Sequence, residues 1–341
     1  MRFDAGIERA IEAGRSPDGR TIRDVVDTAA ERLGERGVQR SEQRLRADLA
    51  GLGPLAEVAG LPGVTDVLVN GDGHTWIDRG EGLERLPPND FGSAEEVRRF
   101  AVRLAGIAGR RLDDAQPWVD GLLPGAVRLH AILPPLAAGG TCLSLRMLRQ
   151  GTVRLADLER VAMCTPEQGE RLRRMVADRD AFVVTGGTGA GKTTLLAALL
   201  AEVDPADRIL VVEDVLEIPL HAGHVVRLQA RPPNVEGTGA VTLVDLVRQA
   251  LRMRPDRLVV GEVRGPEVRE LLQALNTGHE GGCATLHANK PADVPARIEA
   301  LGALAGMSRD AVRAQVATAL KTVVHVARTP AGRRVTSIVD L

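Results

Sequence analysis

The chain has 341 residues and a formal net charge of −1, which comes from 44 basic and 45 acidic side chains. This balance gives no overall attraction to nucleic acid or to an anionic membrane. Aromatic residues are scarce (2%, with no Tyr), which leaves few platforms on which single-stranded nucleic acid could stack. No apolar run approaches the roughly 20 residues of a transmembrane helix, so we expect any membrane association to be peripheral, through a partner.

The length is typical of about two domains. Three cysteines, an odd number without metal-ligand spacing, indicate a reducing cytoplasm with buried thiols. The first residues, Met-Arg-Phe-Asp, lack the apolar segment of a signal peptide. We therefore expect a cytoplasmic protein.

Residues 1–50 are predicted to form a short helical N-terminal extension. Thr21 is a candidate helix cap, with Asp24 in the reciprocal position three residues later. Ser41 could cap a second helix. The mixture of Arg and Glu in this segment is typical of a solvated face.

Residues 51–148 are predicted to form a small α+β domain. The segments 67–71 and 75–78 resemble two strands around a Gly-Asp-Gly turn. Helical periodicity covers 93–108, and the segments 127–133 and 141–146 alternate as half-buried strands do.

Residues 149–341 predict an α/β domain. After a connector and a helical segment over 165–180, a buried strand (181–185) leads into a Gly-rich loop and a helix (195–203). The predicted strands 208–212 and 257–261 alternate with helices 243–253 and 266–276, which indicates a parallel sheet covered on both faces. Residues 291–320 are mostly helical in pattern, and 322–327 with 334–340 predict a closing hairpin.

The Gly-rich loop fits the pattern Gly-x-x-x-x-Gly-Lys-[Ser/Thr], which wraps the phosphates of ATP or GTP. Its backbone N–H groups and the start of the following helix attract anions. Lys192 would reach the outer phosphates and Thr193 would bind Mg²⁺; the chain has only three lysines, the others being Lys290 and Lys321. The predicted nucleotide-binding residues are Gly186, Gly187, Thr188, Gly189, Ala190, Gly191, Lys192, Thr193 and Thr194. The alternative is a Gly-rich turn that binds nothing.

Acidic side chains end two further strands at the sheet edge that carries this loop. Glu213 follows the strand 208–212, with Glu217 soon after, and Glu262 follows Gly261. Nucleotide hydrolysis needs carboxylates that orient water and hold the water shell of Mg²⁺, so we predict a catalytic role for the three glutamates and a metal role for Glu262. The pattern does not say which one is the base, and the alternative is a set of surface acids.

Two histidines are candidate γ-phosphate sensors. His287 lies at the end of a predicted strand in Thr-Leu-His-Ala-Asn, and His279 lies in the Gly-rich segment before it. A lone histidine is often structural, and the spacing does not suggest a Cys/His metal site. Several arginines are candidates for touching phosphate or for purely structural roles: Arg128, Arg146, Arg248, Arg252, Arg254 and Arg264.

Together these motifs resemble those of the secretion traffic ATPases of bacterial type II and type IV secretion and pilus assembly, nearest the Tad/Flp pilus branch. Four blocks carry the resemblance: 186–194, 208–217 (similar to the Asp box), 252–265 (similar to the atypical Walker B) and 276–289 (similar to the His box). The resemblance implies a RecA-like ATPase domain behind a PAS-like N-terminal domain. It also implies a homo-hexamer on the cytoplasmic face of the inner membrane, with Arg128 and Arg146 approaching ATP. Departures from the family pattern occur at Leu122, Cys283 and Lys290.

We therefore predict a Mg²⁺-dependent ATPase motor that drives pilus assembly or secretion, with an inner-membrane platform protein as partner. The alternative is a nucleotide-gated scaffold with negligible turnover. Composition argues against a nucleic-acid translocase and against direct nucleic-acid binding.

Overall fold

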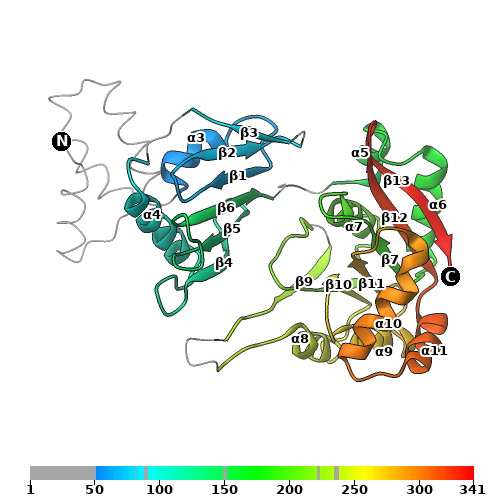
Figure 1. Cartoon of the computed structure of the whole chain (residues 1–341). Coiled ribbons are helices and arrows are strands. Elements are labelled where there is room, and N and C mark those ends of the chain that lie inside the picture. The colour runs from blue at the N-terminus through cyan, green and yellow to red at the C-terminus, as the bar shows by residue number, and fades with distance from the viewer. Residues whose placement is uncertain are drawn as a thin grey trace. The chain divides into compact units, whose positions relative to one another are not determined.

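The computed structural model describes residues 51–80, 82–87, 91–148, 151, 153–220, 223–233 and 238–341. The chain divides into two compact units, Met1–Leu148 and Arg149–Leu341. The helical extension expected over residues 1–50 lies outside the described residues. Figure 1 shows the elements of both units.

The N-terminal unit contains an antiparallel sheet with the strand order β3-β2-β1-β6-β5-β4. It begins with two short helices, η1 (Gly53–Leu55) and α3 (Ala56–Ala59). The strands are β1 (Asp66–Val69), β2 (Thr75–Asp78), β3 (Leu83–Arg85), β4 (Trp118–Leu123), β5 (Val127–Ile132) and β6 (Cys142–Met147).

Helix α4 (Ala94–Ile107) packs against β4 and β5. Ser93 caps its first turn by accepting a hydrogen bond from the backbone N–H of Glu96. Buried apolar side chains from the helix, such as Leu104, meet alternate residues of the strands, such as Leu129 and Leu145. The other face of these strands carries polar side chains.

The predicted strands and helix of this unit are confirmed, within a residue or two at their ends. Strands β3 and β4 were not expected. Strand β4 includes Asp120 and Gly121, two residue types that are depleted in strands, so its sequence gives little local signal.

The C-terminal unit contains a seven-stranded sheet with the order β13-β12-β7-β11-β10-β8-β9. All neighbours are parallel except β12 and β13. The strands are β7 (Phe182–Thr185), β8 (Arg208–Glu213), β9 (His224–Gln229), β10 (Arg257–Val263), β11 (Cys283–Leu286), β12 (Thr322–Thr329) and β13 (Gly332–Asp340).

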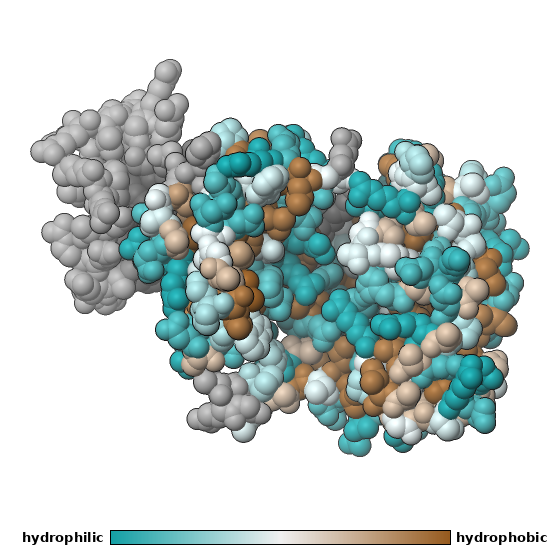
Figure 2. All heavy atoms as spheres, viewed as in Figure 1, coloured by the Kyte–Doolittle hydropathy of each residue, from teal (hydrophilic) through white to brown (hydrophobic). Residues whose placement is uncertain are grey.

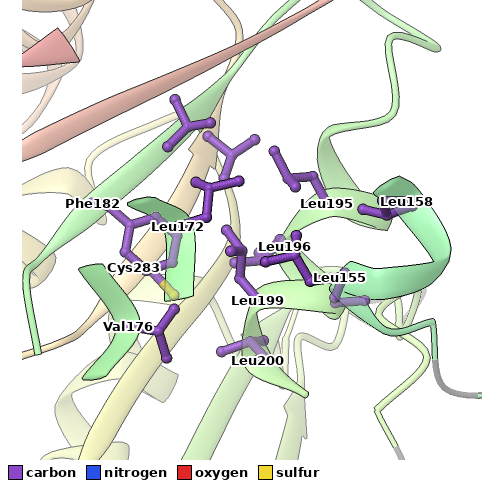
Figure 3. Packing of buried hydrophobic residues seen from close by; sticks show 14 of the residues in the cluster. Leu155, Leu158, Leu172, Val176, Phe182, Leu195, Leu196, Leu199, Leu200 and Cys283 are labelled. Carbon is purple, nitrogen blue, oxygen red and sulfur yellow. The ribbon is translucent and has the colours of Figure 1, made fainter. Parts of the chain in front are cut away.

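Helices cover both faces of this sheet, so that successive residues of the central strands enter two different hydrophobic cores. Figure 3 shows part of the first core, where Leu195, Leu196 and Leu199 lie near Leu172 and Phe182. The first core is built on α5 (Leu155–Arg160), α6 (Pro166–Ala177) and α7 (Lys192–Leu200). The second is built on α8 (Leu243–Ala250), α9 (Val268–Asn276), α10 (Val294–Leu304), which follows the 3-10 turn η2 (Pro291–Asp293), and α11 (Arg309–Ala319).

The α/β class, the parallel sheet covered on both faces and the closing hairpin are confirmed. The helix after the Gly-rich loop begins at Lys192. Strand β9 was not expected; it extends the sheet beyond β8.

Hydrophilic and hydrophobic side chains are interspersed on the face shown in Figure 2. Among the helices in the described ranges, none has both the length and the apolar character that crossing a membrane requires.

Candidate active site

The predicted site residues lie where the parallel strands of the C-terminal unit end. Strands β7, β11, β10 and β8 are consecutive neighbours that run in one direction, so their carboxyl ends share one edge of the sheet. The Gly-rich loop follows β7, His287 follows β11, and Glu262 and Glu213 lie near the ends of β10 and β8. Ligands of open α/β sheets bind at this edge.

The Gly-rich loop is folded tightly against β12. Gly186 has a φ of +152°, and a Cβ at this position would stand 2.2 Å from the backbone oxygen of Val326. Only glycine fits both the conformation and the space. The loop then turns into α7 at Gly191, which has a φ of +103°.

Lys192 folds back over this loop. Its ammonium donates hydrogen bonds to the backbone oxygens of Gly186 (3.1 Å) and Gly187 (3.0 Å). The residue is 8% exposed, and burial lowers the pKa of its ammonium below the ordinary value, although the nearby carboxylate of Glu262 opposes the shift. A buried cation whose hydrogen bonds go to neutral groups is a good partner for an anion.

His287 connects Lys192 to Glu262. Lys192 Nζ lies 3.4 Å from each ring nitrogen of His287, and His287 Nε2 lies 2.6 Å from Glu262 Oε1. Burial, and then the charge of Lys192, lower the pKa of His287, which favours the neutral ring. Glu262 Oε1 has no hydrogen-bond partner among the described residues, so the short distance is a close contact between the ring and the carboxylate.

Arg264 completes this chain of contacts. Its Nε donates to Glu262 Oε2 at 2.8 Å, and its Nη2 donates to the same oxygen. Glu262 therefore shares its carboxylate between a histidine and an arginine, beside the lysine of the Gly-rich loop. We call the contiguous set Lys192, His287, Glu262 and Arg264 the edge chain.

Glu213 has a different environment. It is 3% exposed, and its Oε1 accepts the backbone N–H groups of Glu217 (2.9 Å) and Ile218 (3.0 Å). Its Oε2 lies 3.1 Å from Arg227 Nη2. Burial raises the pKa of Glu213, and these N–H groups and Arg227 oppose the shift. Glu213 thus fixes the turn after β8, while the half-buried Glu217 lies near enough to Arg264 to help raise the pKa of that guanidinium.

The structure does not bring His279 to the edge chain. His279 precedes Cys283, the first residue of β11, which pairs with Phe182, the first residue of β7. It therefore lies at the amino edge of the sheet, opposite the Gly-rich loop, and this corrects the expectation that it faces a γ-phosphate beside Lys192. Its Nδ1 is buried without a hydrogen-bond partner among the described residues.

Three other candidate arginines lie in or just after α8, outside the edge chain. Arg248 Nη2 lies 2.7 Å from Oε1 of the buried Glu270, which joins α8 to α9. Arg252 and Arg254 follow α8, and a phosphate contact for them stays a prediction.

Arg128 and Arg146 lie opposite each other on β5 and β6 of the N-terminal unit. Arg146 Nε lies 2.9 Å from Asp66 Oδ1, and Arg128 Nη2 lies 3.8 Å from Asp120 Oδ1. Both side chains are on the sheet face that carries polar residues. Their predicted contact with a nucleotide stays a prediction.

Two residues of the closing hairpin also contact the site, and no sequence motif marks them. His325 is 6% exposed, and its Nδ1 lies 2.9 Å from Thr185 Oγ1, at the end of β7. It also hydrogen-bonds the backbone of Asn289, beyond β11. Arg333 donates from Nε to the backbone oxygen of Gly189 at 2.9 Å. Both contacts depend on strand register, which no local motif reveals.

The residues present fit a nucleoside triphosphate. The loop presents backbone N–H groups, Lys192 supplies a buried cation that only carbonyls and a neutral ring hold, and the first turn of α7 carries Thr193 and Thr194. Within the described ranges, no group of three or more His, Cys, Asp or Glu side chains is arranged to hold a metal ion. A magnesium ion bound here would therefore take most of its ligands from phosphate and water.

The chain matches the family model "Type II/IV secretion system protein" over residues 48–336. It is 54% identical over 308 residues to a Mycobacterium tuberculosis protein whose name refers to conjugal transfer. This match covers 89% of this chain and 87% of the relative. It is 32% identical over 283 residues to the conjugal transfer protein TrbB of Rhizobium radiobacter (82% and 84%).

The fold is similar to the crystal structure of the pilus retraction motor PilT with bound ADP. The TM-score is 0.61 at 21% identity, over 85% of this chain and 81% of that chain. The likeness bears on the fold, which is that of a RecA-like ATPase domain with a smaller N-terminal domain. From the family match and the close relatives, the chain belongs to the type II/IV secretion system protein family, and it is an ATPase.

Proposed function

We propose that the protein is a Mg²⁺-dependent ATP-hydrolysing motor that acts as a homo-hexamer and powers a secretion, conjugal-transfer or pilus-assembly machine. The edge chain carries this proposal, because it joins the lysine of the Gly-rich loop to a carboxylate of the neighbouring strand through one imidazole. Nucleotide binding alone does not call for the contact between Glu262 and His287, whereas hydrolysis needs a carboxylate near the phosphates.

The roles follow from chemistry and position. The loop N–H groups and Lys192 bind the phosphates, and Thr193 with Glu262 holds the hydrated magnesium ion, which neutralises phosphate charge when bound. His287 is placed to relay the presence of a γ-phosphate from Lys192 to Glu262. Arg128 and Arg146 are proposed to approach the nucleotide from the N-terminal unit.

Among the three candidate glutamates, the contacts favour Glu262 as the one that orients the attacking water. Its carboxylate touches His287 and Arg264, and His287 in turn contacts Lys192 of the loop. Glu213 instead binds two backbone N–H groups and Arg227, so we assign it to positioning, with Glu217 held beside it.

The names of the relatives support a transfer machine. Two relatives that cover most of this chain are named for conjugal transfer, and the family takes in both type II and type IV secretion. We propose an inner-membrane platform protein as the partner and a peripheral position on the cytoplasmic face of the inner membrane. Within this family, a Tad/Flp pilus system is our finer proposal.

Phosphate release by the purified protein at saturating Mg-ATP tests the proposal. Lys192→Ala should abolish turnover and Glu262→Gln should lower kcat about a hundredfold, while Lys321→Ala should leave it unchanged because Lys321 pairs with Asp180 at the surface. A rate per protein that rises with protein concentration would support a ring. Nucleotide binding without sustained release in the wild type would favour the scaffold, and wild-type rates in Lys192→Ala or Glu262→Gln would reject the site.

A further inference from the structure

The closing hairpin runs past the strand that carries the Gly-rich loop. The pairing of β12 with β7 ends at His325 and Thr185, but β12 continues to Thr329 before β13 returns. The backbone oxygen of Val326 therefore lies directly against Gly186. The beginning of β13 is thus placed beside the loop.

Arg333, the second residue of β13, bonds the exposed part of this loop. Gly187, Thr188 and Gly189 are exposed, and Arg333 Nε donates to the Gly189 backbone oxygen at 2.9 Å. The stem of Arg333 runs along the loop as well, since a Cβ added to Gly191 would stand 3.3 Å from Arg333 Cδ.

This bond fixes the orientation of one peptide group. The Gly189 carbonyl and the Ala190 N–H belong to the same planar trans peptide and point in opposite directions. Gly189 has a φ of +70°, and glycine allows such a peptide to rotate at low cost. Rotation would turn a carbonyl dipole toward a bound phosphate, and the guanidinium opposes it by holding the oxygen on the side of β13.

Arg333 and Lys192 thus act on different carbonyls of the same loop. Lys192 holds the oxygens of Gly186 and Gly187, and Arg333 holds that of Gly189. The N–H of the Gly189–Ala190 peptide donates to the Gly187 oxygen at 3.3 Å, so Arg333 and this turn bond together fix both ends of that peptide.

We propose that Arg333 is a positioning residue for nucleotide binding, which fixes the Gly189–Ala190 peptide and so keeps the Gly189 oxygen turned away from the phosphates of the nucleotide. The inference deepens the proposed function at the same site. The ligand class is an anion such as a nucleotide phosphate, because the peptide dipole acts on negative charge.

Titration of the full chain with a fluorescent ADP analogue tests the proposal. Arg333→Gln should raise the Kd about three- to tenfold, as expected for an exposed charge-assisted hydrogen bond, and Arg333→Lys should restore part of the affinity. Arg334→Gln is the matched control. It removes the same charge one residue away, and the Arg334 side chain bonds only the backbone oxygen of Arg333 in the contacts described.

An unchanged Kd in Arg333→Gln would overturn the proposal, and so would an equal loss in Arg334→Gln, which would reveal a general charge effect. A loss of affinity that accompanies a large drop in melting temperature, without any recovery in Arg333→Lys, would mean a merely structural role and would also overturn it. The binding readout needs no turnover, so a wild type that binds but does not hydrolyse would contradict the motor and leave this test intact.

Discussion

Glu213 occupies the space that a side chain at Gly261 would need. A Cβ built on Gly261 would stand 2.7 Å from Glu213 Cγ and 3.3 Å from its Oε1. Because β8 and β10 are neighbours and Glu213 is anchored by backbone N–H groups, the glycine is what lets the buried carboxylate lie there. This accounts for the absence of an aspartate just before Glu262.

Gly261→Ala should therefore displace Glu213 and destabilise the protein by about 1–3 kcal/mol, the usual cost of overpacking. Chemical denaturation measures this cost. In a Glu213→Ala background the same substitution should be close to neutral, because the atom it would meet is gone. Equal costs in the two backgrounds would show that the two positions are not coupled.

The two candidate histidines should differ in their effect on catalysis. His287→Ala breaks the edge chain, so we expect a fall in kcat of about a hundredfold with little change in the affinity for ADP. His279→Ala should leave kcat within about threefold, because His279 lies at the opposite edge of the sheet. Steady-state kinetics of both variants separates them, and a larger fall for His279 would contradict the placement described above.

His325 should make the protein less stable in acid. Burial lowers its pKa below the usual 6.5, and the hydrogen bond to the Asn289 backbone offsets only part of the shift. The unfolded chain therefore takes up a proton near pH 6.5 that the folded protein resists, so stability is full above this pH and falls below it. In urea unfolding between pH 7.5 and 5.5, His325→Gln should remove part of this slope, at most about 1.4 kcal/mol per pH unit.

His130 provides a control of opposite sign. Asp120 raises the pKa of His130, so this pair contributes stability that is present below pH 6.5 and lost as the pH rises. His130→Gln should therefore steepen the acid loss slightly, and only slightly because the side chain is 45% exposed. Slopes that change in the same direction in both variants would contradict the two assignments.

The local features of the site could be predicted because they depend on short stretches of sequence. The Gly-rich loop, the strand before it and the acids that end β8 and β10 are contiguous motifs, and parallel topology then places them at one edge. The position of His279 could not be predicted in the same way. Nothing in the residues around it shows that β11 begins only at Cys283, which leaves His279 before the strand, at the other edge of the sheet.

The remaining contacts are long-range. Arg227 reaches Glu213 from β9, a strand that was not expected. His325 meets Thr185 across 140 residues of sequence, and Arg333 meets Gly189 across 144. These pairings exist only once the register of β12 against β7 is set, and a shift of one residue would turn His325 to the other face.

Helix α7 restricts where mechanical work can arise. From Leu195 to Leu200 every side chain is at most 3% exposed, so the helix is enclosed on all sides and a swing or slide of the Gly-rich loop would open voids in a close-packed interior. The end of the loop that joins α7 is therefore held rigidly by the core. Displacements driven by a nucleotide would fall instead on more exposed groups, such as the side chain of Arg264, which is 56% exposed, and the segment that carries Glu217.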